Sequence, residues 1–180
     1  MKQLVIVNGP MGVGKSTVCR ALLKRLERAV YLDGDWCWNM HPFTINPENK
    51  AMVLRNICFL LRSFLENSQL DMVIFCWVIP ELAILEQILE PMQDISIEPR
   101  VFTLVCEPST LRRRLEADVA ADRREADCVE RGLTYLSCYA DMPTCHVATD
   151  DRAPEEIAAW MAEKLREKVP EGGNLWGRER

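Results

Sequence analysis

Residues 9–16 read Gly-Pro-Met-Gly-Val-Gly-Lys-Ser and fit the pattern Gly-x-x-x-x-Gly-Lys-Ser/Thr of a phosphate-binding loop. The apolar residues 4–7 before this loop predict a buried strand, and residues 17–23 after it predict an amphipathic helix. Glycines allow the backbone N–H groups of the loop to converge on an anion, and the helix N-terminus adds its positive dipole end. The sequence therefore predicts a nucleotide phosphate site near the start of the chain.

The two polar residues that end this loop have separate expected roles. Lys15 is expected to reach the β- and γ-phosphates as a catalytic residue, and the Ser16 hydroxyl is expected to ligate Mg²⁺. The residues expected to contact the nucleotide are Gly9, Met11, Gly12, Val13, Gly14, Lys15, Ser16 and Thr17.

Length and composition restrict the classes of protein that fit. The chain has 180 residues, enough for one domain with a sizeable core, with 48% hydrophobic and 27% charged residues. Its net charge of -5 argues against a nucleic-acid surface. No apolar stretch approaches the roughly 20 residues of a membrane span, and no signal peptide pattern precedes the first strand. We expect a cytoplasmic protein with neither nucleic-acid nor membrane partners.

The eight cysteines do not form a metal-binding or disulfide pattern. No two of them make a Cys-x-x-Cys pair, and Cys58, Cys76 and Cys106 lie inside apolar runs. A cysteine in such a run acts as a small hydrophobic residue. The sequence thus predicts reduced cysteines, as in a cytoplasmic protein.

Strand-like and helix-like segments alternate along the chain. Apolar runs at residues 4–7, 29–32, 72–78, 101–105 and 145–148 are each separated by helical periodicity. This alternation predicts an α/β fold of three layers, αβα, with a five-stranded parallel sheet and the ligand site at the carboxyl ends of the strands. We expect one domain over residues 1–169, as a monomer or homodimer, and a flexible tail over residues 170–180.

Two carboxylates separated by one glycine, Asp33-Gly34-Asp35, follow the second predicted strand. At this strand end they are expected to face the γ-phosphate. Asp35 would align the hydroxyl of an acceptor and take its proton, and Asp33 would hold the metal and border the acceptor. The alternative is an ordinary Asp-Gly-Asp turn.

With these residues in place, the chain resembles the small P-loop kinases of the nucleoside-monophosphate-kinase fold. Gluconate, adenylylsulfate and shikimate kinases have a similar Asp-x-Asp after the second strand. The chloramphenicol phosphotransferases and the tunicamycin-resistance proteins are similar in overall layout, including the motif Leu111-Arg112-Arg113-Arg114-Leu115. The resemblance covers most of residues 1–168 and implies transfer of the γ-phosphoryl group of ATP, assisted by Mg²⁺, to a hydroxyl or phosphate of a small molecule.

The resemblance also implies a helical lid over about residues 112–128. Arg114 would lie near the adenine or the phosphates, and Arg123 or Arg124 would close on the transferring group as catalytic residues. The loop that ends at Pro154 would lie against the adenine. The alternative for any one arginine is an ion pair on a solvated helix.

The sequence also departs from the family pattern. The third strand ends in Phe75-Cys76-Trp77, without the aspartate that usually helps to hold the metal. No Asn-Lys-x-Asp guanine signature is present, since Asn49-Lys50 is followed by Ala51-Met52, and this favours ATP over GTP.

The acceptor pocket is expected beyond Asp35. Aromatic residues gather there, and the predicted acceptor contacts are Asp33, Asp35, Trp38, Arg55 and Trp77. Aromatic walls suit a flat or apolar acceptor such as a nucleoside, a sugar ring or an antibiotic, and Arg55 would hold an acidic group. The alternative is that the tryptophans only cover the hydrophobic core and have no role in binding. Two further classes remain open: a nucleotide-binding resistance or regulatory protein without transferase activity, and a switch-type NTPase.

Overall fold

A parallel sheet of five strands forms the centre of the protein. The computed structural model describes residues 2–167, and its strands lie in the order β2-β3-β1-β4-β5. Their bounds are β1 (Lys2–Asn8), β2 (Ala29–Asp33), β3 (Met72–Cys76), β4 (Ile97–Val105) and β5 (Cys145–Ala148). Every neighbouring pair is parallel. The predicted five-stranded parallel sheet is confirmed.

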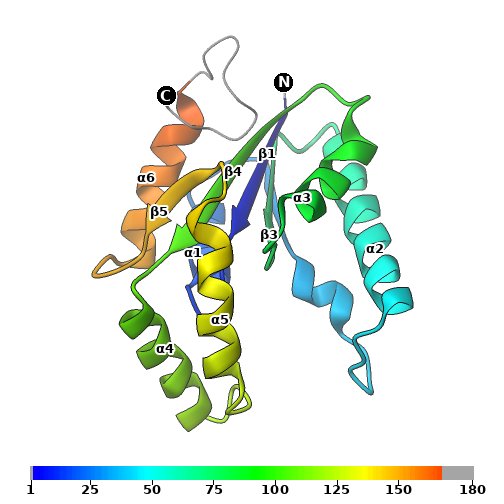
Figure 1. Cartoon of the computed structure of the whole chain (residues 1–180). Coiled ribbons are helices and arrows are strands. Elements are labelled where there is room, and N and C mark those ends of the chain that lie inside the picture. The colour runs from blue at the N-terminus through cyan, green and yellow to red at the C-terminus, as the bar shows by residue number, and fades with distance from the viewer. Residues whose placement is uncertain (1, 168–180) are drawn as a thin grey trace.

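Helices cover both faces of this sheet (Figure 1). They are α1 (Lys15–Leu23), α2 (Pro47–Glu66), α3 (Leu82–Leu89), α4 (Pro108–Ala120), α5 (Cys128–Ala140) and α6 (Pro154–Arg166), with short 3-10 helices η1 (Gly34–Trp38) and η2 (Glu90–Met92). In Figure 1, α1 and α6 lie on one face, and α2 and α3 lie on the other. Helices α4 and α5 extend past the edge at which the strands end, so this edge is flanked by α4 and α5 on one side and by the segment after β2 on the other.

Each face of the sheet has its own core because alternate side chains of a strand point in opposite directions. Val5 and Val7 of β1 belong to the core beneath α1 and α6, which also holds Leu111 and Leu115 of α4. Leu4 and Ile6 belong to the core beneath α2 and α3. All four β1 side chains are fully buried, which explains why the strand reads as an unbroken apolar run.

The boundaries differ from the sequence prediction in three places. β3 ends at Cys76 instead of residue 78, and β4 begins at Ile97, four residues earlier than predicted. The stretch after β4 contains two helices separated by residues 121–127, and this break carries Arg123 and Arg124. The lid predicted over about residues 112–128 therefore corresponds to most of α4 together with this break.

Other expectations from the sequence can be placed on the same structure. All eight cysteines are free thiols. Within residues 2–167 there is no helix with the length and apolar character needed to cross a membrane. The tail predicted over residues 170–180 lies outside the described residues.

Candidate active site

The phosphate-binding loop joins β1 to α1 at the carboxyl edge of the sheet. Gly12 and Gly14 have φ values of 79° and 107°, in the left-handed region that favours glycine. A Cβ on Gly12 would lie 2.6 Å from Leu115 Cδ2, whereas a Cβ on Gly14 would meet no atom within 4 Å. Leu115 of α4 thus packs directly on the loop, while the backbone at Gly14 is open to the approach of a phosphate at the start of α1.

The Lys15 ammonium is held inside this loop. Its Nζ donates hydrogen bonds of 2.9 Å to the carbonyl oxygens of Gly9 and Pro10. Burial lowers the pKa of Lys15, and the charges of Cys76, Asp35 and Asp33 oppose that shift. The loop carbonyls therefore bind a partly buried cation whose side chain has the length and position to bind a phosphate oxygen.

Ser16, Asp33 and Tyr31 form a hydrogen-bonded cluster beside the loop. Asp33 Oδ2 accepts from Ser16 Oγ and from the Tyr31 hydroxyl, each at 2.8 Å, and Asp33 Oδ1 accepts from the backbone N–H of Asp35 at 3.2 Å. Burial raises the pKa of Tyr31, so its hydroxyl keeps the proton that it donates. The hydrogen bond to Asp33 thus orients the Ser16 hydroxyl and leaves its oxygen lone pairs available to a metal ion.

This cluster fits a Mg²⁺ ion brought by a nucleotide. Mg²⁺ prefers hard oxygen ligands and keeps several of its waters, so one hydroxyl with phosphate oxygens is enough protein ligation. Among residues 2–167, no group of three or more histidine, cysteine or acidic residues is arranged to hold a metal ion unaided. With both oxygens of Asp33 already engaged, Ser16 suits direct contact and Asp33 suits contact through water.

Cys76 occupies the strand end at which the sequence lacks an aspartate. It pairs with Asp33 across β2 and β3 and with Val7 across β1. Its Sγ lies 3.1 Å from the Tyr31 hydroxyl and 3.9 Å from Ser16 Oγ. The carboxylate that contacts Ser16 therefore comes from β2, one strand away from the usual position.

Asp35 lies in η1, just past the cluster. Partial burial, followed by the nearby Asp33 charge, raises its pKa, while Lys15, Arg124 and a hydrogen bond from Trp77 oppose the rise. A Cβ on Gly34 would lie only 2.6 Å from Trp77 Cγ, so the indole packs against the backbone between the two aspartates. Asp35 and Trp77, both predicted from sequence, are thus brought together.

Arg114 connects the phosphate-binding loop to the loop after β5. Its guanidinium donates to the carbonyl oxygen of Val13 at 3.1 Å and to Thr149 Oγ1 and the Thr149 carbonyl oxygen, both at 2.8 Å. Thr149 begins the loop that leads to Pro154, the first residue of α6. This pairing sets the predicted adenine loop beside the phosphate site.

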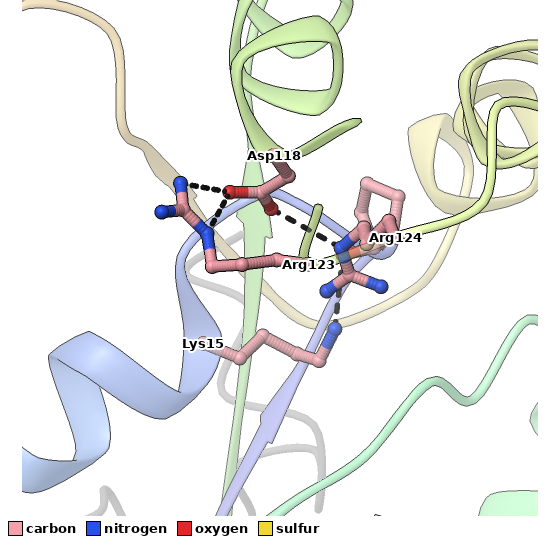
Figure 2. Close-up of polar contacts among 5 residues, drawn as sticks. Lys15, Asp118, Arg123 and Arg124 are labelled. Atoms are coloured by element: carbon pink, nitrogen blue, oxygen red, sulfur yellow. Dashed lines mark hydrogen bonds and ion pairs between the residues drawn. The ribbon is translucent and has the colours of Figure 1, made fainter. Parts of the chain in front are cut away.

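Arg123 and Arg124 both bind Asp118 of α4. Arg123 Nη2 and Arg124 Nε lie 2.7 Å and 3.1 Å from the two oxygens of that carboxylate. Figure 2 shows the contacts of both arginines with Asp118. The hydrogen bond from Arg123 lowers the pKa of Asp118. To bind a phosphate, either arginine would have to break its ion pair with Asp118 and pair with phosphate oxygens instead.

A cavity of about 810 Å³ opens beside Asp35. Its lining residues are Asp35, Trp36, Trp38, Asn39, Phe43, Ile45, Lys50 and Tyr135. Trp38, one of the predicted acceptor contacts, is among them. Arg55 is exposed on α2 and is not among the lining residues, whereas Lys50, in the first turns of the same helix, is.

Sequence reasoning missed four residues at this edge. Tyr31 had a usable signal, because it lies two residues before Asp33 and so faces the same side of β2. Asp118 precedes Arg123 and Arg124 by five and six residues, outside the usual helical pairing distance, because the chain turns after α4. Lys50 and Tyr135 had no local signal, since only the fold brings α2 and α5 to one cavity.

Comparisons of sequence and fold agree with this geometry. A family model described as an AAA domain matches residues 5–133, and the chain belongs to this family. The cytidylate kinase of Buchnera aphidicola subsp. Baizongia pistaciae (strain Bp) is 33% identical over 60 residues, which make up 33% of this chain and 26% of that kinase. The match thus spans about a quarter of the length of the curated relative.

Solved structures show the same fold. The tunicamycin resistance protein of Deinococcus radiodurans superposes with a TM-score of 0.64 at 18% identity, over 93% of this chain and 98% of that one. The APS kinase CysC of Mycobacterium tuberculosis, solved with AMPPNP and APS, gives 0.64 at 17% identity, over 92% and 98%. In class, the chain is a P-loop protein of the AAA family with the three-layer αβα fold that these solved structures share.

Proposed function

We propose that this chain transfers the γ-phosphoryl group of ATP to a hydroxyl or phosphate group of a small molecule, with Mg²⁺ bound to the nucleotide. One observation carries the proposal: Lys15, the Ser16–Asp33 pair and Asp35 converge at the edge of the sheet where the cavity opens. A protein that only bound a nucleotide would need no carboxylate between the phosphate site and an open cavity.

The chain's own residues supply positioning and charge. Backbone N–H groups of the loop and the Lys15 ammonium bind the β- and γ-phosphates. Arg114 stabilises the loop by donating a hydrogen bond to the carbonyl oxygen of Val13. Arg123 and Arg124, released from Asp118, add positive charge as negative charge develops on the transferring group. Ser16 would contact a bound Mg²⁺ directly, and Asp33 would contact it through water. The ion would neutralise part of the negative charge of the phosphate oxygens.

Asp35 acts on the acceptor. It accepts a hydrogen bond from the attacking hydroxyl and then takes the proton. The acceptor oxygen forms a bond to the γ-phosphorus, and the bond from that phosphorus to the bridging oxygen breaks, with ADP leaving. The proton passes from Asp35 to solvent. The raised pKa of Asp35 makes it a stronger base than an ordinary aspartate.

Two variants test the assignment. In a coupled assay for ADP release with a panel of hydroxylated compounds, we expect release that depends on a particular acceptor. Asp35→Asn should lower that turnover by about a thousandfold while ATP affinity, measured by calorimetry, stays within about twofold, since the amide cannot take a proton. Lys15→Ala should weaken ATP binding whatever the acceptor.

The second candidate is a nucleotide-binding resistance or regulatory protein without transferase activity. Tight ATP binding with no acceptor-dependent ADP release across the panel, and no effect of Asp35→Asn, would favour that candidate and contradict ours. The absent guanine signature supports ATP as the nucleotide, and competition by GTP measures that preference.

A further inference from the structure

The cavity beside Asp35 has walls from segments that are far apart in the sequence. Residues of η1 and the following loop form one side, Lys50 comes from α2, and Tyr135 comes from α5. In Figure 1, α5 and the segment after β2 lie on opposite sides of the edge at which the strands end. The volume of about 810 Å³ lies within the roughly 300–1,000 Å³ typical of small-molecule sites.

Aromatic and aliphatic side chains dominate these walls and remain exposed to solvent. Phe43 is 62% exposed, Ile45 is 57% exposed and Trp36 is 55% exposed. Clustered exposure of large apolar residues at one place marks a binding surface. These rings are also held in fixed orientations: Trp38 and Phe43 have centroids 5.8 Å apart, and Trp36 meets Tyr31 edge-on at 5.5 Å.

The charges of the cavity are few and well defined. Among residues 2–167, Asp35 is the only carboxylate that lines it, and Lys50 is the only lining cation. Lys50 has no ion-pair partner within the described part of the chain, although ten such pairs occur there. An anionic group on a bound molecule would therefore pair with Lys50, and repulsion from Asp35 would keep that group away from the reacting end.

A polyhydroxylated chain fits these walls poorly. Its hydroxyl groups could use the polar atoms of Asp35, Asn39, Lys50 and Tyr135, but it would leave the exposed apolar faces of the walls uncovered. A flat ring system needs no hydrogen-bond partners and would cover the exposed aromatic faces.

We propose that this cavity binds the phosphoryl acceptor, and that the acceptor is an alcohol with a flat aromatic body and one anionic group. The inference rests on the proposed kinase function. The ring lies against Trp38 and Phe43 with Tyr135 opposite, the anion pairs with Lys50, and the hydroxyl meets Asp35. Its oxygen bonds to the γ-phosphorus as the bond to ADP breaks, and its proton goes to Asp35.

Three probes separate the features of this acceptor. 6-(Hydroxymethyl)-2-naphthoate has ring, anion and hydroxyl; 2-naphthalenemethanol lacks the anion; gluconate lacks the ring. Calorimetry in the presence of a non-hydrolysable ATP analogue should show the naphthoate binding at least tenfold more tightly than either of the others. Lys50→Met should remove that advantage over naphthalenemethanol, and Tyr135→Ala should weaken both aromatic probes. Lys24→Met, at the C-terminal cap of α1 and outside this cavity, is the matched control and should change neither affinity.

The outcomes distinguish this inference from the proposed function. Equal or tighter binding of gluconate, or naphthoate binding that is indifferent to Lys50→Met and Tyr135→Ala, overturns the aromatic-acid assignment, even if gluconate stimulates ADP release. Selective naphthoate binding that depends on Lys50 supports the assignment. If the naphthoate binds in this way but no ADP is released with ATP, the cavity still binds an aromatic acid and the proposed kinase function is wrong. Binding of the ATP analogue at the wild-type affinity verifies that each variant is folded.

Discussion

Ser16 Oγ donates a 2.8 Å hydrogen bond to Asp33 Oδ2, joining the end of the phosphate-binding loop to the end of β2. The contact places a buried carboxylate behind the hydroxyl that is expected to meet Mg²⁺. Cys76 occupies the neighbouring strand end, so we propose that the carboxylate orienting the metal ligand comes from β2 instead of β3. The arrangement makes the geometry of Ser16 depend on Asp33.

Asp33→Asn should therefore weaken the apparent Mg²⁺ affinity by about 10–100-fold, the usual effect of losing a group that orients a metal ligand. Titration of ADP release against Mg²⁺ measures the change. Tyr31→Phe is the matched control, since it removes one donor to Asp33 while leaving the Ser16 contact, and it should shift the titration less. An equal effect of both variants would contradict the role given to Ser16.

Arg114 should matter for nucleotide binding through the loops that it joins. Arg114→Met removes three hydrogen bonds and leaves the carbonyl oxygens of Val13 and Thr149 without their donor. We expect ATP to bind about tenfold more weakly, which corresponds to about 1.4 kcal/mol. Arg113→Met, one residue away on the exposed side of α4, should leave the calorimetric affinity unchanged. Comparable losses in both variants would mean that the charge of α4, and not the loop contacts, is responsible.

Asp118 should oppose closure over the nucleotide because it holds both arginines. Exposed ion pairs contribute about 0–1 kcal/mol, so Asp118→Asn should tighten ATP binding by about two- to fivefold. Glu116→Gln, which alters an ion pair elsewhere on α4, serves as the control. Weaker ATP binding in Asp118→Asn would indicate that the pairing helps the closed form.

The same pairing sets a pH dependence. Because the pKa of Asp118 is lowered in the folded protein, the carboxylate is fully ionised above the ordinary aspartate pKa of about 3.9, and the pairing is lost only as the pH falls through the lowered value. The difference in ATP affinity between wild type and Asp118→Asn should thus be constant from about pH 5 to 8. A difference that disappears as the pH falls from 8 to 5 would show that the pKa of Asp118 is raised instead of lowered.

Gly12 and Gly14 should respond differently to alanine. Both have positive φ, which costs about 1–3 kcal/mol for a residue with a side chain, but only at Gly12 does the new Cβ meet Leu115. Gly12→Ala should therefore lower the free energy of unfolding more than Gly14→Ala does, as measured by urea denaturation. Adding Leu115→Ala should make the Gly12→Ala penalty smaller than it is alone. Additive losses in the double variant would contradict the proposed contact.

Much of the fold followed from local pattern. Short, mostly apolar runs identified all five strands, and the glycine-rich loop between the first strand and its helix located the expected phosphate site. The strand ends were less predictable: Trp77 and Val78 continue the apolar run of β3, yet the ladder stops at Cys76 as the chain turns toward α3. The break between α4 and α5 was also missed, because their charged surfaces continue the helical pattern across it.

The sequence by itself determined the phosphate-binding loop, the parallel sheet and the paired aspartates, since each depends on residues adjacent in the chain. Only the tertiary structure decided which groups meet across the edge of the sheet: Ser16 on Asp33, Asp118 on two arginines, and Lys50 rather than Arg55 in the cavity. The Ser16 contact and the cavity join segments far apart in sequence, and the pairing of Asp118 depends on how the chain turns after α4. The packing of helices against the sheet and the turn of the chain set this geometry, and neither has a periodic signature in the sequence.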